Sequence, residues 1–362
     1  MRVGHMDLRT QHANVTVTVA LGALLSASSC VPAEARQRPD DTRIGGVREL
    51  ARVVFEALHS ESADGDSRLS WSNDFFKGAD GTVYVPFTLS IDPPKLRTTQ
   101  ATVYVLVVET QAAPDSDGQL PGAPSSSALD ELQGPSPPAI AFEAAYFVDL
   151  NTLPRDATTA GHRITRAFSV GPGEHDVYVA LAESTPASGG AAPDVMLSKQ
   201  RLSVPDLWDR TLTTSSIVLV DRVEQPDVPL VPDRQVYRDA LGTERFVKAA
   251  DANFRPSDHL NVLFFVYNPG LTAEGLPNVL VDYVFYRREE TGEAYVGRSN
   301  PQRFNARTMV EFEAAAGQEI MAGHEVSLRS FSEGSYRLYI RITDNTNGST
   351  VVRSVNFNVS GS

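Results

Sequence analysis

The chain has 362 residues, of which 41 % are hydrophobic, and a formal net charge of −13. This length suits two domains of ordinary size, and the apolar content allows each of them to bury a core of its own. The acidic balance argues against nucleic acid or an anionic membrane as a partner, because both need a positive patch. The single cysteine lies near the N-terminus, so we expect no disulfide or thiol chemistry in the folded part.

The first 35 residues have the pattern of an export signal. Arg2 and Arg9 lie in a polar start, and residues 15–27 form a short apolar run. That run is too short to span a bilayer, which takes ~20 residues. No other stretch is apolar enough to be a transmembrane segment, so we predict none.

The end of this leader has two interpretations. Ala33-Glu34-Ala35 is an A-x-A pattern, which predicts cleavage after Ala35 and an exported protein, periplasmic or extracellular. Alternatively, residues 27–30 form a lipoprotein signal, in which case Cys30 carries a lipid anchor at the new N-terminus.

Residues 36–69 are predicted to be a polar linker with one short amphipathic helix over 47–58. Five apolar residues recur at the spacing of one helix face: Val47, Leu50, Ala51, Val54 and Leu58. Charged residues occupy the other side: Arg48, Glu49, Arg52 and Glu56. About 12 residues are marginal as an isolated helix, so we expect the apolar stripe to pack on the domain that follows. Residues 36–46 are expected to be disordered.

The first domain is predicted over residues 70–208 from apolar side chains that alternate with period two. Val83–Ile91 reads as a half-buried strand, and residues 103–107 read as a strand that is nearly apolar on both sides. Further strands are expected at 141–148, 164–170, 176–181 and 202–204. Two segments rich in small and polar residues, 111–139 and 185–193, are predicted to be disordered insertions.

The second domain, predicted over residues 212–362, repeats the plan of the first. Four landmarks recur in the same order with different loop lengths between them. These pairs are Phe75–Asp80 with Phe246–Asp251, Ile91–Pro93 with Tyr267–Pro269, Thr102–Glu109 with Leu280–Glu289, and Gly173–Val179 with Gly334–Ile340. Duplication of one domain is our interpretation, with a boundary near Trp208–Thr211.

The last forty residues predict an antiparallel hairpin with one buried face. Four residues of the first strand point inward: Tyr336, Leu338, Ile340 and Ile342. Residues 344–348 supply turn chemistry, because Asn and Gly tolerate positive φ. Four residues then return along the same buried face: Val351, Val355, Phe357 and Val359.

The stretch Gly334–Asp344 resembles the penultimate strand of immunoglobulin-like and fibronectin type III-like bacterial modules. Trp71–Pro93 also resembles uncharacterised secreted bacterial proteins, some of which accompany proteins with a Gly-Trp-x-Thr-Asp motif. That motif is absent here, as are the cysteine pair and the core tryptophan of antibody domains. The resemblance implies a fold only: an all-β chain of two tandem antiparallel β-sandwich (immunoglobulin-like) domains, preceded by one short amphipathic helix.

No catalytic motif is found, so we predict a protein that is not an enzyme and has no cofactor and no metal site. The histidines are isolated, and the nucleophile elbow and the phosphate loop are both missing. Two alternatives remain open. A pair of carboxylates on distant strands cannot be recognised from sequence. Calcium could bind near Asn73, Asp74 and Asp80, or at the Asx-rich turns 115–118 and 344–348.

The candidate binding surface is the outward row of the last hairpin, Arg337, Tyr339 and Arg341, with Arg353 nearby. This row suits an acidic or aromatic partner, or it is simply a solvated strand face. Trp71 and Trp208 lie at domain edges, where they either stack on a sugar or close the end of a core.

The sequence thus predicts a non-catalytic secreted or periplasmic interaction module that binds a protein or an envelope polymer. The alternative is a carbohydrate-binding or accessory protein of an extracellular hydrolase system. Exposed aromatic side chains gathered on one sheet would favour the alternative.

Overall fold

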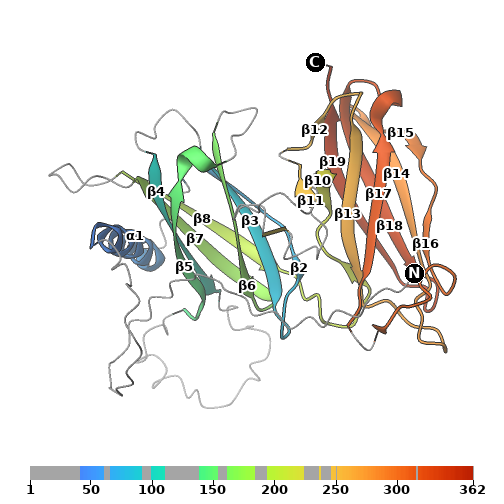
Figure 1. Ribbon diagram of the computed structural model, residues 1–362, viewed down its shortest axis with the longest axis horizontal. Coiled ribbons are helices and arrows are strands. Elements are labelled where there is room, and N and C mark those ends of the chain that lie inside the picture. Colours follow the sequence, from blue (N-terminus) through green and yellow to red (C-terminus); the bar gives the residue numbers. More distant parts are fainter. Residues whose placement is uncertain are drawn as a thin grey trace, which may run out of the picture.

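The computed structural model describes residues 41–60, 66–91, 99–110, 138–153, 161–183, 194–223, 236–237, 246–249, 251–314 and 317–361. The predicted leader, the lipid-anchor position and nearly all of the two predicted insertions lie outside these residues. The described part consists of antiparallel sheets in sandwich-like domains, preceded by one α-helix, as predicted (Figure 1). None of the helices within these ranges is long and apolar enough to cross a membrane.

The first half contains two four-stranded sheets that face each other across one core. In one sheet β3 is central and pairs with the three others, and its strands are β1 (Leu69–Asn73), β2 (Phe76–Lys77), β3 (Val83–Ile91) and β6 (His162–Val170). The other has the order β5-β4-β7-β8, with β4 (Gln100–Glu109), β5 (Ile140–Asp149), β7 (Gly173–Glu183) and β8 (Val195–Val204). The alternating residues of β3 and the odd-numbered valines of β4 fill the core between them.

The helix α1 (Asp41–Ser60) covers the outer face of the β5-β4-β7-β8 sheet (Figure 1). Leu50 and Val54 are fully buried there against Tyr104, Leu106 and Tyr178. The predicted packing is confirmed, and it explains why β4 is apolar on both sides. The helix begins at Asp41, six residues earlier than predicted, so its first turns replace part of the expected disordered linker.

The second half also contains two sheets around one core. The first has the order β11-β10-β13-β17, and its strands are β9 (Thr213–Thr214), β10 (Val218–Val223), β11 (Phe246–Lys248), β13 (His259–Tyr267) and β17 (Ile320–Ser327). The second has the order β12-β19-β18-β14-β15, with β12 (Asn253–Phe254), β14 (Val279–Glu289), β15 (Gly292–Arg298), β16 (Gln302–Phe304), β18 (Gly334–Asp344) and β19 (Thr350–Val359). All pairings are antiparallel except the short one between β12 and β19.

The strand pairings of the two halves correspond. β3 pairs with β6 as β13 pairs with β17, and β4 pairs with β5 and β7 as β14 pairs with β15 and β18. Gly173 and Gly334 each open a strand at positive φ and lie opposite the last residue of the next strand, Val204 and Val359. With these two glycines equated, Tyr178 takes the position of Tyr339, and Leu106 that of Val284.

The two halves meet through one sheet of each. An apolar cluster joins Phe76 of β2 to Val218, Val220 and Leu263 of the second half. The Phe75 N–H donates to Ser216 Oγ at 2.9 Å, and the Tyr237 hydroxyl donates to Asp74 Oδ2 at 2.6 Å. The contact therefore combines buried apolar surface with specific hydrogen bonds.

Candidate functional site

The outer face of the β12-β19-β18-β14-β15 sheet carries a row of polar and aromatic side chains. Alternation along β18 sends Tyr336, Leu338, Ile340 and Ile342 into the core, where all are buried. The residues between them point outward. In the same way β14 buries Val281, Tyr283 and Phe285 and presents its intervening residues on the outer face.

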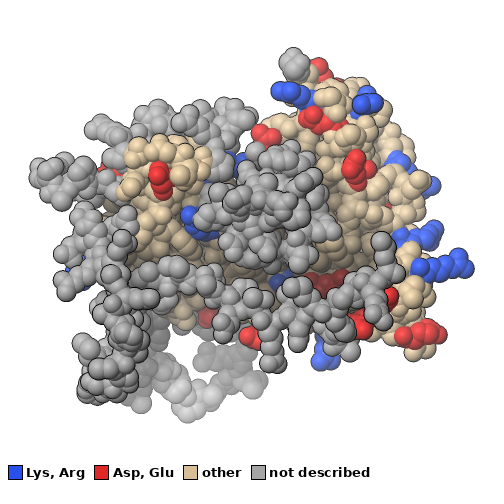
Figure 2. All heavy atoms as spheres, viewed as in Figure 1, with Lys and Arg blue, Asp and Glu red and all other residues tan. Residues whose placement is uncertain are grey.

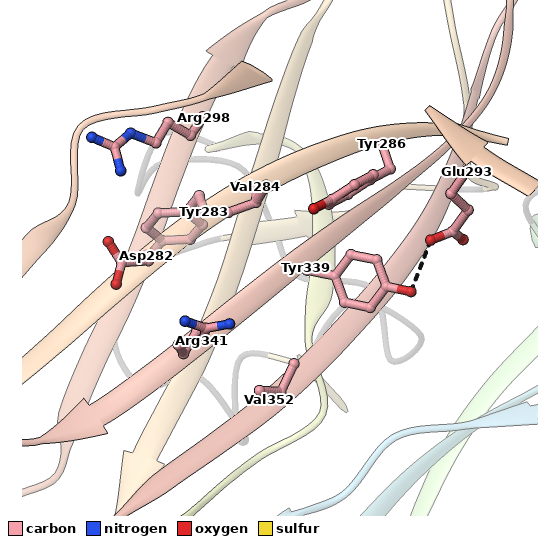
Figure 3. A pocket seen from close by; sticks show the side chains of 9 residues that line it. All are labelled: Asp282, Tyr283, Val284, Tyr286, Glu293, Arg298, Tyr339, Arg341 and Val352. Carbon is pink, nitrogen blue, oxygen red and sulfur yellow. Dashed lines mark hydrogen bonds between the residues drawn. The ribbon is translucent and has the colours of Figure 1, made fainter. Parts of the chain in front are cut away.

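A pocket of about 580 Å³ lies on this outer face (Figure 3). It is lined by residues of four neighbouring strands: Asp282, Tyr283, Val284, Tyr286, Glu293, Arg298, Tyr339, Arg341 and Val352. Strand register brings them together, because Asp282 lies opposite Arg341, and Val284 lies opposite both Tyr339 and Arg298. The volume falls within the ~300–1,000 Å³ that is typical of ligand sites.

One end of the pocket is closed by an internal network. The Tyr339 hydroxyl donates to Glu293 Oε2 at 3.0 Å, and Arg337 Nη1 lies 2.9 Å from Glu293 Oε1. Arg337 also donates to Tyr339 at 3.2 Å and to Asn356 at 2.9 Å. The hydrogen bond to Tyr339 and the charge of Glu293 raise the pKa of Arg337. The guanidinium group of Arg337 is therefore already bound by residues of its own sheet.

At the other end, two guanidinium groups have no hydrogen-bond or ion-pair partner among the described residues. Arg298 and Arg341 are exposed, and neither makes a hydrogen bond or ion pair with any other residue that the structure describes. They lie on either side of β14, with Asp282 on the strand between them (Figure 3). This end of the pocket can offer forked donors to an anionic group.

Three tyrosines gather beside the arginines. The ring of Tyr286 is edge-to-face with those of Tyr295 and Tyr339, at interplanar angles of 77° and 88°. Tyr295 is 61 % exposed and Val352 48 % exposed, so aromatic and aliphatic surface is open to solvent around the pocket.

The other predicted binding residues lie elsewhere. Arg353 pairs with Ile340 and therefore faces the opposite side of the sheet from Arg341, where it donates to the hydroxyl oxygens of Thr213 and Thr214. Trp71 stacks on Phe87 with ring centroids 4.3 Å apart and packs against the first core. Trp208 is 41 % exposed, donates to the Thr82 carbonyl oxygen and lies over Lys77.

Two of the calcium candidates have their carboxylates engaged within the chain. Asp344 is fully buried and accepts hydrogen bonds from Gly270 N, Thr346 N and Thr346 Oγ1. Its carboxylate therefore stabilises the β18–β19 turn. Asp74 accepts from Tyr237. Within the described ranges no three His, Cys, Asp or Glu side chains cluster in a way that could hold a metal ion.

Sequence reasoning identified the β18 side of the pocket and missed the β14–β15 side. The signal for β14 was present, because Asp282, Val284 and Tyr286 alternate with buried apolar residues. Arg298 and Glu293 carried no such signal, because β15 is exposed along most of its length and shows no alternation.

No protein family matches the sequence, and no curated protein matches it. Among solved structures, a point mutant of Salmonella alpha-2-macroglobulin shares 10 % identity at a TM-score of 0.19, over 82 % of this chain and 17 % of that one. The native E. coli alpha-2-macroglobulin shares 10 % at 0.20, over 82 % and 16 %. The methylamine-reacted Salmonella protein shares 11 % at 0.20, over 83 % and 17 %. The chain thus spans less than a fifth of these proteins.

Proposed function

We propose that this chain is an exported, non-catalytic binding protein whose second sandwich holds a protein partner or an envelope polymer. The binding face is the outer surface of β14, β15 and β18, around the pocket. Tyrosine and arginine are among the side chains most enriched where protein interfaces gain their binding energy, and the pocket brings both types together.

One observation carries the proposal. In the first half, the corresponding outer face is apolar and α1 covers it: Leu106 and Tyr178 are almost fully buried beneath the helix. In the second half, the positions that correspond to them are Val284 and Tyr339, which are half-buried and line an open pocket. No helix among the described residues covers this second face. Among the described residues, this face is left open where the corresponding face of the other half is covered, and it is therefore the contact surface that we propose.

The test is affinity capture from envelope extracts with the mature chain as bait. Tyr286→Ala removes the central ring of the tyrosine cluster, so we expect it to reduce the captured partner at least tenfold. Arg329→Ala, at an exposed arginine that does not line the pocket, serves as the matched control and should capture as well as the native chain. Equal capture by all three baits would contradict the proposal.

Carbohydrate binding is the second candidate, because three tyrosines lie on one sheet face. Against it, both ring pairs are edge-to-face, whereas a sugar stacks on a flat exposed ring. Glycan-array binding that Tyr295→Ala abolishes, with no protein captured, would favour this second candidate.

A further inference from the structure

We infer that the occupant of the pocket is an acidic polypeptide segment, with a carboxylate between Arg298 and Arg341 and an aliphatic or aromatic side chain on Val284. This inference rests on the proposed function, and it adds the chemical class of the ligand.

Charge is the first support. Strands β14, β15, β16, β18 and β19 contain seven arginines, no lysine and four acidic residues, a net charge of seven minus four, or +3. The whole chain has a net charge of −13. Figure 2 shows several Lys or Arg side chains along the outer margin of the second half, the side on which β15 lies in Figure 1. A basic sheet in an acidic chain complements an acidic partner.

The state of the individual arginines is the second support. Arg337 is already neutralised by Glu293 and shares hydrogen bonds with Tyr339 and Asn356. Arg298 and Arg341 have no such partner among the described residues, so their donors are available to a ligand carboxylate. The network around Arg337 holds Tyr339 in place as one wall of the pocket, while the free pair supplies the charge.

The apolar part of the pocket indicates that the ligand also carries an apolar side chain. Val284 lines the pocket opposite Tyr339, and Val352 adds an exposed methyl surface (Figure 3). Tyr286 and Tyr339 are perpendicular to each other, so beside these valines they suit a compact side chain better than a flat sugar ring. The helix α1 shows that one segment with leucine and valine side chains is enough to cover the corresponding face of the first half.

The position of Asp282 favours a polypeptide ligand over a uniformly charged polyanion. Its carboxylate lies on β14 between the two free arginines, directly opposite Arg341. A polyuronate or a nucleic acid would bring closely spaced negative charges against it, which costs binding energy. A polypeptide has backbone N–H groups that can donate to this carboxylate while a side-chain carboxylate reaches the arginines. The pocket thus selects for a segment with isolated acidic residues.

A random-peptide display library panned against the full chain tests this, with the double variant Arg298→Gln/Arg341→Gln as the counter-target. We expect enriched peptides to contain Asp or Glu beside Leu, Ile, Val or Phe. For a synthetic copy of such a peptide, each single Arg→Gln change should weaken binding about tenfold or more, because hydrogen bonds to charged groups are the strong ones. Arg329→Gln should have no effect, and added salt should weaken binding to the native chain.

Three outcomes would overturn the inference: enriched peptides without an excess of acidic residues, equal binding to the double variant, or displacement of the peptide by polygalacturonate at equal carboxylate concentration. Circular dichroism melts of each variant guard against loss of folding. If envelope capture depends on Tyr286 but not on the two arginines, the face binds a partner of other chemistry, and only this inference fails. If capture depends on neither, the proposed function fails with it.

Discussion

Lys77 lies at the contact between the two halves, within range of the charge of Glu319. Lys77 Nζ donates to Asn268 Oδ1 at 2.8 Å and lies 4.8 Å from the ring centroids of Trp208 and Tyr267. Burial raises the pKa of Glu319 from an ordinary 4.5 to about 6, although the nearby Lys77 charge opposes the shift. Burial also lowers the pKa of Lys77. For both residues, the attraction of the opposite charge offsets only part of the cost of burial.

We predict that Glu319→Gln raises the melting temperature at pH 7.5 and has little effect at pH 4. The folded state binds the Glu319 proton more tightly than the unfolded state does. Its contribution to stability is therefore full below pH 4.5 and is lost as the pH rises through 6. The group is partly exposed and Lys77 loses its neighbour, so we expect a gain of about 1 kcal/mol or less. Glu311→Gln, at an exposed position, is the matched control and should change the melting temperature little at pH 7.5.

For single residues, the sequence predicted which side chains alternate along a strand, but not which residues each side chain contacts. Arg341 and Arg353 look equivalent in sequence, yet the register of β18 with β19 puts them on opposite sides of the sheet. Trp71 and Trp208 also look alike, but Trp71 stacks on a ring of the first core, whereas the Trp208 ring packs against Lys77 of β2. Such differences depend on pairing between distant strands, which periodicity does not specify.

At the scale of elements, α1 is the clearest case of a prediction from sequence. Its five-residue apolar stripe predicted both a helix and a docking face, and the two-sided apolar character of β4 supplied the matching surface. The start of the helix was not predicted, because Gly45 and Gly46 are poor helix formers and are read locally as linker.

We predict that Leu50→Asp destabilises the chain by about 3 kcal/mol, because a carboxylate replaces a fully buried side chain beneath the helix. Arg48→Asp introduces the same side chain at an exposed position of the same helix and should change the free energy of unfolding by about 0.5 kcal/mol or less. Urea denaturation of both variants measures this. Equal stability of Leu50→Asp and the native chain would mean that the helix is not docked.

The two strand-opening glycines give a matched pair of element-scale predictions. Gly173 has φ +129° and Gly334 has φ +150°, a backbone region that side chains rarely adopt. Alanine at either should cost about 1–2 kcal/mol through backbone strain. Gly334→Ala should cost more, because its Cβ would come within 3.0 Å of Arg287 Nε, whereas nothing lies within 4 Å at Gly173. Thermal melts of the two variants should therefore rank them, and a larger loss of stability for Gly173→Ala would contradict the crowding at Gly334.

For the whole molecule, the fold class followed from period-two patterning, and duplication of one sandwich remains our interpretation of the repeat. The contact between the halves was not predictable, because its apolar residues have the same sequence pattern as residues of a sandwich core. These residues are Phe76, Val218, Val220 and Leu263. Half of the pocket was predictable. The sequence predicted the residues of β18 that line it, but the residues of β15 are identified only by the pairing of β15 with β14.

We predict that residues 209–362 fold alone with a cooperative melt, since their core is drawn from 212–359. Their melting temperature should be lower than that of the full chain, because Val218, Val220 and Leu263 lose their cover from the first half. Circular dichroism of this fragment makes the measurement. A fragment without a cooperative transition would indicate one interwoven unit instead of two domains.

We propose that the open face of the second sandwich holds a partner, and site-specific photo-crosslinking in the producing cells tests this directly. Val352 lines the pocket and is 48 % exposed, while Val310 is 74 % exposed and does not line it. A photoreactive benzoylphenylalanine at each position compares the two surfaces in one chain. We predict a discrete adduct from position 352 and none from position 310. Adducts from position 310 alone, or from neither position, would contradict a binding site on this face.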